Sequence, residues 1–391
     1  MKTGFIAASI ALTLLAWAPP APSQAVLDAL RDRGALAWQT SKLKAIRGVT
    51  IGPIENKLHP DRGYGSDRCA RTMEEARRMG ANWVSLTPFG RVWDLSSSGI
   101  ALDFEAPSGE NRRAVRDAVA QAHAAGLRVL LVPHLWVESG GWRGEIEPGS
   151  EERWRAFAAS YRRFVLHWAQ LAREAGVDML AVGIELRSWV TTARAPEFAD
   201  IVREVRSVYP GPLTYAANWD DVEQTVIWGE LDIIGINGFY PLARRKGAPL
   251  AALRRGAGDV RKKVKALAEQ WDKPVLFTEF GYTTREDPAI EPWIWPDHLE
   301  KVVIDEQAQA DAYRALLGAL VDEPRFAGFF VWRVYADPDD VSQEAEWGFS
   351  PRGKRAELVL RDAFTAHWAA DGPRPLGAAL IRRAAERVGD F

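Results

Sequence analysis

The chain has 391 residues, which is enough for one large domain or for two or three ordinary ones. Its 50 Lys and Arg nearly balance its 52 Asp and Glu, so the net charge of −2 provides no general attraction to nucleic acid or anionic membranes. The single cysteine, Cys69, excludes an internal disulfide framework and a Cys-based zinc cluster. Tryptophan is unusually abundant, with 17 copies, and serves either core packing or a ligand that stacks on flat rings.

The first 25 residues have the features of a secretory signal peptide. Lys2 is followed by an apolar run at 6–16 and by the small-x-small site that ends at Ala25. The apolar run is short for a bilayer-spanning helix. We therefore expect a secreted or periplasmic protein without stable membrane insertion after cleavage, and an uncleaved membrane anchor is the alternative.

From residue 46 onward, short apolar runs alternate with longer amphipathic stretches at helical spacing. The apolar runs predict eight strands, at 46–54, 82–89, 128–136, 179–185, 213–218, 232–240, 275–282 and 327–335. The amphipathic stretches predict helices at 68–79, 111–125, 151–175, 195–209, 259–271, 306–320 and 355–369. Glycines stand where several of these helices end, as expected for helix termini.

Apolar strands alternating with helices predict a parallel sheet that is covered by helices. Eight such units predict a single-domain α/β protein, a (β/α)8 TIM barrel over residues 46–370. A doubly wound open sheet is the alternative, but it would carry a Gly-rich phosphate turn after its first strand, and Gly52-Pro53-Ile54 is no such turn. Residues 26–45 predict a leading helix and residues 371–391 a C-terminal tail.

Two glutamates end apolar strands of this predicted barrel. Glu185 closes the fourth strand and Glu279 stands near the end of the seventh. A buried carboxylate is costly unless it is paired, hydrated or used, so a structural ion pair is the alternative for each one. Active sites of such barrels lie at the carboxyl ends of the strands. Two carboxylates there favour retaining glycoside cleavage, which needs an acid and a nucleophile ~5–5.5 Å apart.

The motifs around these glutamates resemble those of a large clan of retaining glycoside hydrolases. Four stretches, at 133–136, 182–185, 235–240 and 278–281, look most like family 113, whose known members are β-mannanases. The resemblance covers residues 46–370 and implies that Glu185 is the general acid/base and Glu279 the nucleophile. It also implies that Tyr240 hydrogen-bonds the nucleophile and that Trp332 lies under the cleaved sugar.

One residue departs from the pattern of the clan. Much of the clan has Asn before the acid/base, in contact with the sugar 2-hydroxyl, whereas this chain has Ile184. Asn218 and Asn237 are the candidates to replace that contact. Without a replacement the enzyme would be a poorer catalyst than its relatives, because the contact stabilises the transition state.

Other polar and aromatic residues that follow strands are expected to contact sugar. They are Arg91, Trp93, His134, Trp136, Asn218 and Asn237, together with Trp293 and Trp295 in the long segment after the seventh strand. Strand alternation predicts that Arg333 points away from Trp332. Of the tryptophans, those expected at the barrel mouth are Trp93, Trp136, Trp189, Trp219, Trp293, Trp295 and Trp332.

The sequence therefore predicts an exported, monomeric glycoside hydrolase that acts on an oligosaccharide or polysaccharide, with β-1,4-mannan as the first choice. No cofactor and no metal are expected, because the six histidines are scattered and form no zinc motif. A carbohydrate-binding barrel with weak or no activity and an envelope transglycosylase are the alternatives.

Overall fold

The computed structural model describes residues 45–54, 59, 61–103, 106–295, 301–340 and 346–372. The predicted signal peptide at 1–25 lies outside these residues. So do the predicted leading helix at 26–45, apart from residue 45, and the predicted tail at 371–391, apart from its first two residues. Among the helices within the described ranges, none is long and apolar enough to cross a membrane.

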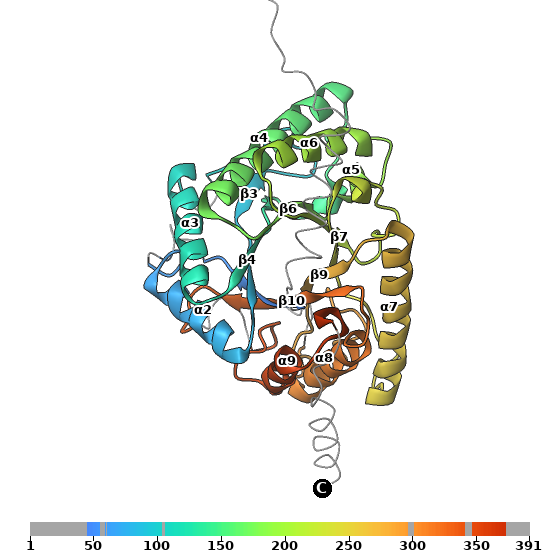
Figure 1. The fold of residues 1–391 in the computed structure, drawn as a ribbon. Coiled ribbons are helices and arrows are strands. Elements are labelled where there is room, and N and C mark those ends of the chain that lie inside the picture. The colour runs from blue at the N-terminus through green and yellow to red at the C-terminus, as the bar shows by residue number, and fades with distance from the viewer. Residues whose placement is uncertain are drawn as a thin grey trace, which may run out of the picture.

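Eight parallel strands close into a barrel, with helices around it (Figure 1). The strands are β1 (Ile46–Gly52), β2 (Trp83–Leu86), β4 (Arg128–Leu131), β6 (Met179–Ile184), β7 (Leu213–Asn218), β8 (Ile234–Asn237), β9 (Val275–Phe280) and β10 (Phe326–Tyr335). They are hydrogen-bonded in the order β1-β10-β9-β8-β7-β6-β4-β2, which closes because β2 pairs with β1. The predicted (β/α)8 TIM barrel is confirmed.

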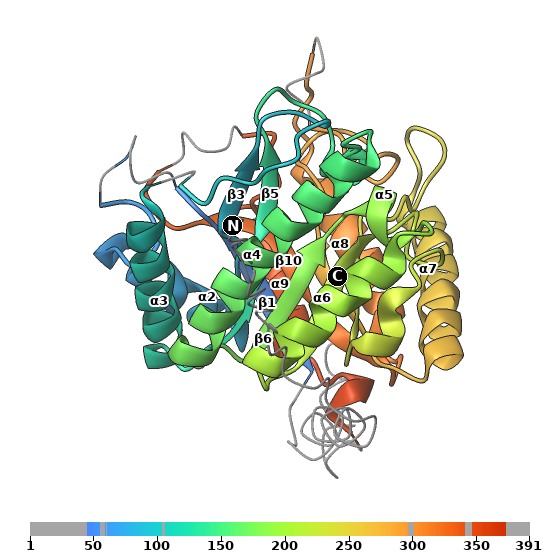
Figure 2. The same ribbon diagram turned by 90° about the horizontal axis from the view of Figure 1, so that it is seen from above.

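Two further strands extend the barrel at the carboxyl ends of β2 and β4. β3 (Phe89–Val92) and β5 (His134–Val137) pair in parallel as a separate two-stranded sheet. Figure 2 shows this sheet at the upper end of the barrel. The predicted strand at 128–136 is thus two strands, separated at Pro133, which has no N–H for the ladder. This break lets His134 begin a strand at the mouth of the barrel.

The covering helices alternate with the strands along the chain. They are α2 (Asp67–Met79), α3 (Ser108–Ala124), α4 (Glu151–Ala175), α6 (Ala195–Val208), α7 (Leu250–Trp271), α8 (Glu306–Leu320) and α9 (Arg355–Thr365). Short helical turns lie in the connections: α5 (Arg187–Val190), η1 (Arg143–Glu145), η2 (Ile227–Glu230) and η5 (Ala369–Asp371).

Helix α7 begins at Leu250, earlier than the predicted 259, and α9 ends at Thr365, earlier than the predicted 369. Gly256 weakens the helical pattern at the start of α7, but close packing requires a glycine at this position. A Cβ there would lie 2.2 Å from the carbonyl oxygen of Leu242. The glycine therefore allows the helix to pack closely on the connection that follows β8.

The hydrophobic core has two large clusters of buried side chains. Side chains inside the barrel form one cluster, in which the rings of Trp83 and Phe330 meet edge to face at 6.4 Å. A larger cluster fills the space between strands and helices. The base of the barrel is closed by a buried ion pair of 2.6 Å between Arg47 and Asp371. Asp371 also accepts the backbone N–H of Ala45, so both ends of the described chain are fixed together.

Candidate active site

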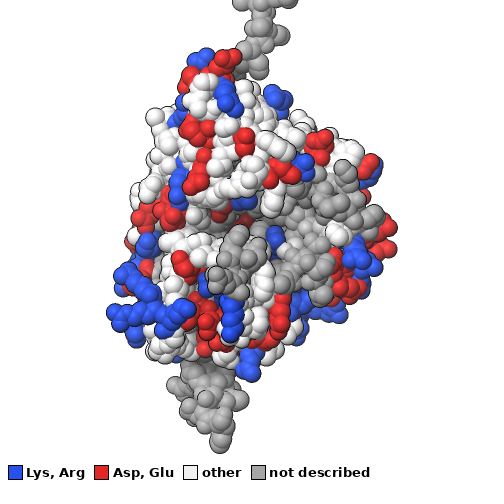
Figure 3. All heavy atoms as spheres, turned by 180° about the vertical axis from the view of Figure 1, so that it is seen from behind, with Lys and Arg blue, Asp and Glu red and all other residues white. Residues whose placement is uncertain are grey.

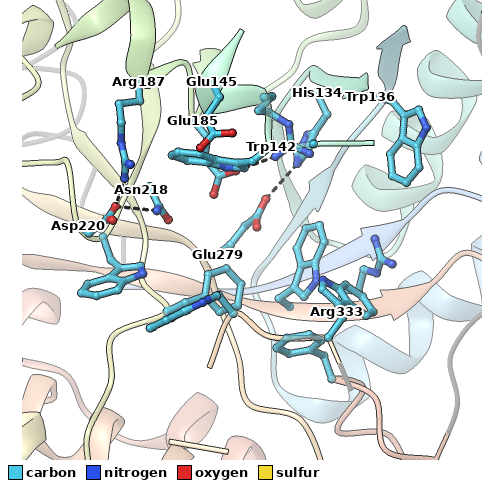
Figure 4. A pocket seen from close by; sticks show the side chains of 18 of the residues that line it. His134, Trp136, Trp142, Glu145, Glu185, Arg187, Asn218, Asp220, Glu279 and Arg333 are labelled. Atoms are coloured by element: carbon cyan, nitrogen blue, oxygen red, sulfur yellow. Dashed lines mark hydrogen bonds and ion pairs between the residues drawn. The ribbon is translucent and has the colours of Figure 1, made fainter. Parts of the chain in front are cut away.

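A pocket of about 920 Å³ opens where the barrel strands end (Figure 4). Two kinds of side chain line it. The rings are Phe89, His134, Trp136, Trp142, Trp219, Phe239, Trp293, Trp295, Trp332 and Phe349. The other polar and charged side chains are Arg143, Glu145, Glu185, Arg187, Asn218, Asp220, Glu279 and Arg333. Carboxylates among flat rings can bind a polar ligand that has apolar faces.

Glu185 follows β6 and is held by three N–H donors. Its Oε2 accepts from Trp142 Nε1 at 2.9 Å and from Arg143 Nη1 at 2.8 Å. Its Oε1 accepts from Asn237 Nδ2 at 2.9 Å. Glu185 has a positive φ of 50°, and its backbone N–H donates to the carbonyl of Ala216 on β7. The strand end and the three donors together fix the carboxylate toward the pocket.

The loop after β5 supplies two of these donors. Gly140 and Gly141 have φ of 86° and 103°, a region that L residues rarely adopt, and they turn the chain toward Glu185. The guanidinium of Arg143 is anchored because its Nε donates to the carbonyl of Leu135 at 2.8 Å. Arg187 lies over the ring of Trp142, 4.4 Å from its centre. The loop is therefore fixed on both sides.

Asn237 ends β8 and is fully buried. Its Oδ1 accepts a hydrogen bond from the hydroxyl of Thr278 at 3.0 Å, which directs its amide N–H toward Glu185. In this structure Asn237 thus contacts Glu185 rather than lining the pocket. Asn218 does line the pocket, where it donates to Asp220, and is the remaining candidate for the 2-hydroxyl contact.

Glu279 lies in β9 and forms a hydrogen bond with His134. The distance from His134 Nε2 to Glu279 Oε1 is 3.1 Å, and that from His134 Nδ1 to the carbonyl oxygen of Val132 is 2.7 Å. A carbonyl only accepts, so Nδ1 carries a proton. Burial, followed by the charge of Arg143, lowers the pKa of His134 to about 3, and its ring is neutral at ordinary pH. Nε2 is then an acceptor.

If Nε2 is the acceptor, the proton of this hydrogen bond comes from the carboxyl group of Glu279. Burial, followed by the charge of Glu185, raises the pKa of Glu279 well above its ordinary value of 4.5. Arg143 and Arg333 act in the opposite direction. Burial therefore favours the protonated form of Glu279, which is the form that can donate to His134 Nε2.

Aromatic rings form the walls of the pocket. Trp219 and Trp293 are stacked, with ring centres 5.2 Å apart and planes at 24°. Trp332 is stacked on His134 at 6.2 Å, next to Glu279. Trp295 meets Phe349 at 5.0 Å. Such rings can pack on the C–H faces of a sugar while the carboxylates contact its oxygens.

The structure brings most of the predicted site residues together. Those that line the pocket are Glu185, Glu279, His134, Trp136, Asn218, Trp293, Trp295 and Trp332. Arg91 lies nearby in β3, where it forms an ion pair of 3.2 Å with Glu138. Trp93 is 67% exposed and, like Arg91, does not line the pocket. Trp189, expected at the mouth, is instead buried against the helices, where its ring packs on Phe198.

The expectation for Tyr240 needs correction. The resemblance assigns it a hydrogen bond to Glu279, but among the described residues the side chain of Glu279 is hydrogen-bonded to His134 and not to Tyr240. Tyr240 is buried beside the pocket, where its ring packs against Trp219 at 5.6 Å and Phe277 at 5.9 Å. Its contribution here is to support Trp219.

Sequence reasoning missed the contributions of Trp142, Arg143 and Arg333. The pair Gly140-Gly141 was the available signal for the first two, because it marks a tight turn just before them. The prediction that Arg333 points away from the site is wrong. The pairing of β10 with β1 shifts register between Val331 and Val334, and such an irregularity re-aims side chains. Arg333 consequently lines the pocket with Trp332.

A (β/α)8 barrel with two strand-end carboxylates in an aromatic pocket has the features of a glycoside hydrolase. The model of Glycoside Hydrolase Family 113 matches residues 57–354, and the chain belongs to this family. The predicted resemblance is confirmed, and the protein is a glycoside hydrolase. No curated protein sequence matches the chain.

Solved structures agree with this assignment. The GH113 β-mannanase of Alicyclobacillus acidocaldarius in complex with ManMIm is 27% identical, with a TM-score of 0.71 over 83% of this chain and 98% of that one. A GH113 β-1,4-mannanase complex is 22% identical, with a TM-score of 0.69 over 83% and 100%. A family 5 mannosidase from Rhizomucor miehei, 12% identical with a TM-score of 0.56 over 82% and 92%, shares the fold.

Proposed function

We propose that the protein is an exported enzyme that hydrolyses β-mannosidic bonds with retention of anomeric configuration. The observation that carries the proposal is the pair of buried glutamates, Glu185 and Glu279, which face one pocket from the ends of β6 and β9 (Figure 4). The substrate class is supported by the β-mannanases named above, which share the family and the fold.

The proposed reaction has two steps. Glu279 attacks the anomeric carbon as a carboxylate while Glu185 protonates the leaving oxygen, which gives a covalent glycosyl-enzyme. Glu185 then removes a proton from water, and the water oxygen attacks the same carbon and releases Glu279. Trp332, stacked beside His134, lies where it can support the sugar that Glu279 attacks.

The free protein does not have the proton arrangement that the first step needs. Burial favours the protonated form of Glu279 beside His134, whereas the oxygens of Glu185 accept from Trp142, Arg143 and Asn237. Substrate binding must therefore leave Glu279 ionised and give Glu185 a proton. Because burial raises the pKa of Glu279, we expect the acidic limb of the pH–activity profile to lie above the range of an ordinary glutamate.

Two variants test the roles separately. Glu279→Gln should abolish turnover of every substrate, because no nucleophile remains. Glu185→Ala should lose about 10²–10⁴-fold on mannohexaose, whose leaving group needs a proton, and far less on an aryl β-mannoside with an acidic phenol. Added azide should then give a β-mannosyl azide, since no carboxylate shields the intermediate. Equal losses on both substrates would contradict the assignment of Glu185.

Glu138→Gln is the matched control, because Glu138 pairs with Arg91 outside the pocket. It should leave activity unchanged, and circular dichroism should show that all three variants are folded. Proton NMR of the first product tests retention directly, and an inverted anomer would overturn it. Products longer than the substrate would indicate transglycosylation instead, whereas binding without any product would indicate an inactive carbohydrate-binding barrel.

A further inference from the structure

Arg333 differs from the other cations of the pocket because no carboxylate is paired with it. Arg143 forms an ion pair of 2.8 Å with Glu185, and Arg187 forms one of 2.9 Å with Asp221. Within the part of the chain that the structure describes, Arg333 makes no such pair. Its positive charge is therefore available to a ligand.

Aromatic rings hold this guanidinium in place. Its central carbon lies 4.7 Å from the ring centre of Trp332, 5.5 Å from that of Trp295 and 4.6 Å from that of Tyr335. Its Nη2 donates to the hydroxyl of Tyr335, and its Nε is buried without a hydrogen-bond partner in the described protein. Rings stabilise a cation without neutralising it, so the site is ordered and still positively charged.

The position of Arg333 relates it to the sugar that reacts. It stacks on Trp332, which is itself stacked on His134, the hydrogen-bond partner of Glu279. Figure 4 shows Arg333 on one side of Glu279, with Arg187 and Asp220 on the other. Arg333 and Glu279 line the same pocket, and the charge of Arg333 acts on Glu279, so a sugar bound against Glu279 lies near this guanidinium.

We propose that Arg333 binds a carboxylate on the sugar held against Glu279, so that the preferred substrate is a β-linked glycan containing hexuronic acid residues. The proposal rests on the hydrolytic function proposed above and narrows its substrate class. A guanidinium is suited to this role because its planar N–H groups match the two oxygens of a carboxylate. A neutral hydroxymethyl group at C6 offers a single oxygen and no charge.

The loop that follows β8 carries charge of the same sign. Arg244, Arg245 and Lys246 are consecutive and exposed, and none forms an ion pair with another described residue. Their loop is joined to the segment that carries Trp293, because Leu242 N donates to the carbonyl of Ala289 at 2.8 Å. Figure 3, from the side opposite to Figure 1, shows Lys and Arg side chains gathered at one edge of the molecule. Positive charge on this loop attracts an acidic chain.

The test compares two substrates that differ only in this group. They are mannohexaose and the same hexaose with its C6 hydroxymethyl groups oxidised to carboxylates. The wild type should have at least about a tenfold higher kcat/KM for the carboxylated hexaose, because a charge-assisted bidentate contact forms only there. Arg333→Gln should abolish this preference through KM, whereas any loss of kcat/KM that comes from the removed charge near Glu279 should be the same for both hexaoses. Arg333→Lys, which keeps the charge but not the planar geometry, should restore part of the preference.

Arg325→Gln is the matched control, since Arg325 pairs with Asp272 outside the pocket, and it should retain the wild-type preference. Equal losses on both substrates in Arg333→Gln would overturn the proposal and indicate that Arg333 acts only on the charge of Glu279. A wild type that prefers the neutral hexaose would also overturn it. Calorimetric binding of both hexaoses to Glu279→Gln reports on Arg333 without turnover. Failure of hydrolysis, which contradicts the proposed function, is thereby distinguished from failure of carboxylate recognition.

Discussion

Glu185 and Glu279 end two strands of one barrel, yet the protein holds them in different ways. They are buried to a similar extent, with 8% and 6% of their surface exposed, so burial does not distinguish them. Glu185 accepts hydrogen bonds from three N–H groups, one of them on the guanidinium of Arg143. Glu279 faces the neutral ring of His134. The difference lies in the donors around each carboxyl group.

This comparison shows how one barrel face can give two glutamates opposite states. Three donors match the lone pairs of a carboxylate, whereas an imidazole acceptor matches a protonated carboxyl group. Burial thus favours a proton on Glu279 in the free protein, whereas the proposed reaction needs a proton on Glu185. Trp142 and Arg143 line the pocket, so a bound sugar lies beside two of the donors of Glu185.

Among variants that change the surroundings of Glu185 and Glu279, Arg143→Met is expected to have the largest effect. Glu185 loses its charged partner, and Glu279 loses a cation that lowers its pKa. We expect kcat/KM to fall about 10–100-fold and its acidic limb to move to higher pH, because the pKa of Glu279 rises further. The measurement is a pH profile of kcat/KM for wild type and variant.

The control for this variant is Arg187→Met. Arg187 lies over the ring of Trp142 but forms its ion pairs with Asp220 and Asp221. If the loss in Arg143→Met came only from a displaced loop, Arg187→Met would reproduce it, including the shift in pH. An acidic limb that stays in place in Arg143→Met would show that Arg143 does not act on the charge of Glu279.

The regular parts of the molecule could be predicted from the sequence because they follow local periodicity. All eight barrel strands and the seven long helices lie where the apolar pattern placed them. The two glutamates were found in the same way, since each interrupts an apolar run at a strand end. The start of α7 was not predicted because the glycine at position 256 interrupts the helical pattern. That glycine is required by close packing against Leu242, a tertiary contact that local sequence does not contain.

The parts of the site that could not be predicted depend on irregular backbone or on distant partners. Arg333 enters the pocket through a register shift in β10, which no alternation rule contains. Arg143 lies 42 positions before Glu185 in the sequence and reaches it because a glycine turn redirects the chain. Trp189 shows the opposite error. It follows a strand end closely and was expected at the pocket, but it is buried among the helices. Residue type suggested a role in each case, but the local backbone decides whether the side chain reaches the pocket.

A smaller effect is expected in the pH dependence of stability. The pKa of Glu279 is raised in the folded protein, so the folded state binds a proton that the unfolded state has lost above pH 4.5. That contribution to stability is complete below pH 4.5 and decreases as pH rises toward the folded pKa. The free energy of unfolding of wild type minus that of Glu279→Gln should therefore fall as the pH rises above 4.5, by at most ~1.4 kcal/mol per pH unit and only up to the folded pKa.

Urea unfolding of both proteins between about pH 5 and pH 8 measures this difference, in which most other titrating groups cancel. Glu138→Gln provides the control, because Glu138 is partly exposed and pairs with Arg91. Its difference from wild type should stay nearly constant over this range. A constant difference for Glu279→Gln as well would mean that Glu279 is ionised in the free protein, and the contrast with Glu185 would be lost.

The smallest effect is expected from a change in the aromatic wall of the pocket, because the stacked pair of Trp219 and Trp293 forms no hydrogen bond with either glutamate. Trp293→Ala removes one ring of the stacked pair with Trp219 and with it an apolar surface for a sugar at some distance from the reacting bond. We expect KM for mannohexaose to rise about three- to tenfold with kcat unchanged, because such binding is equal in ground and transition states. Trp93→Ala, at an exposed tryptophan outside the pocket, should change neither constant. A fall in kcat for Trp293→Ala would instead connect this wall to the positions of Glu185 and Glu279.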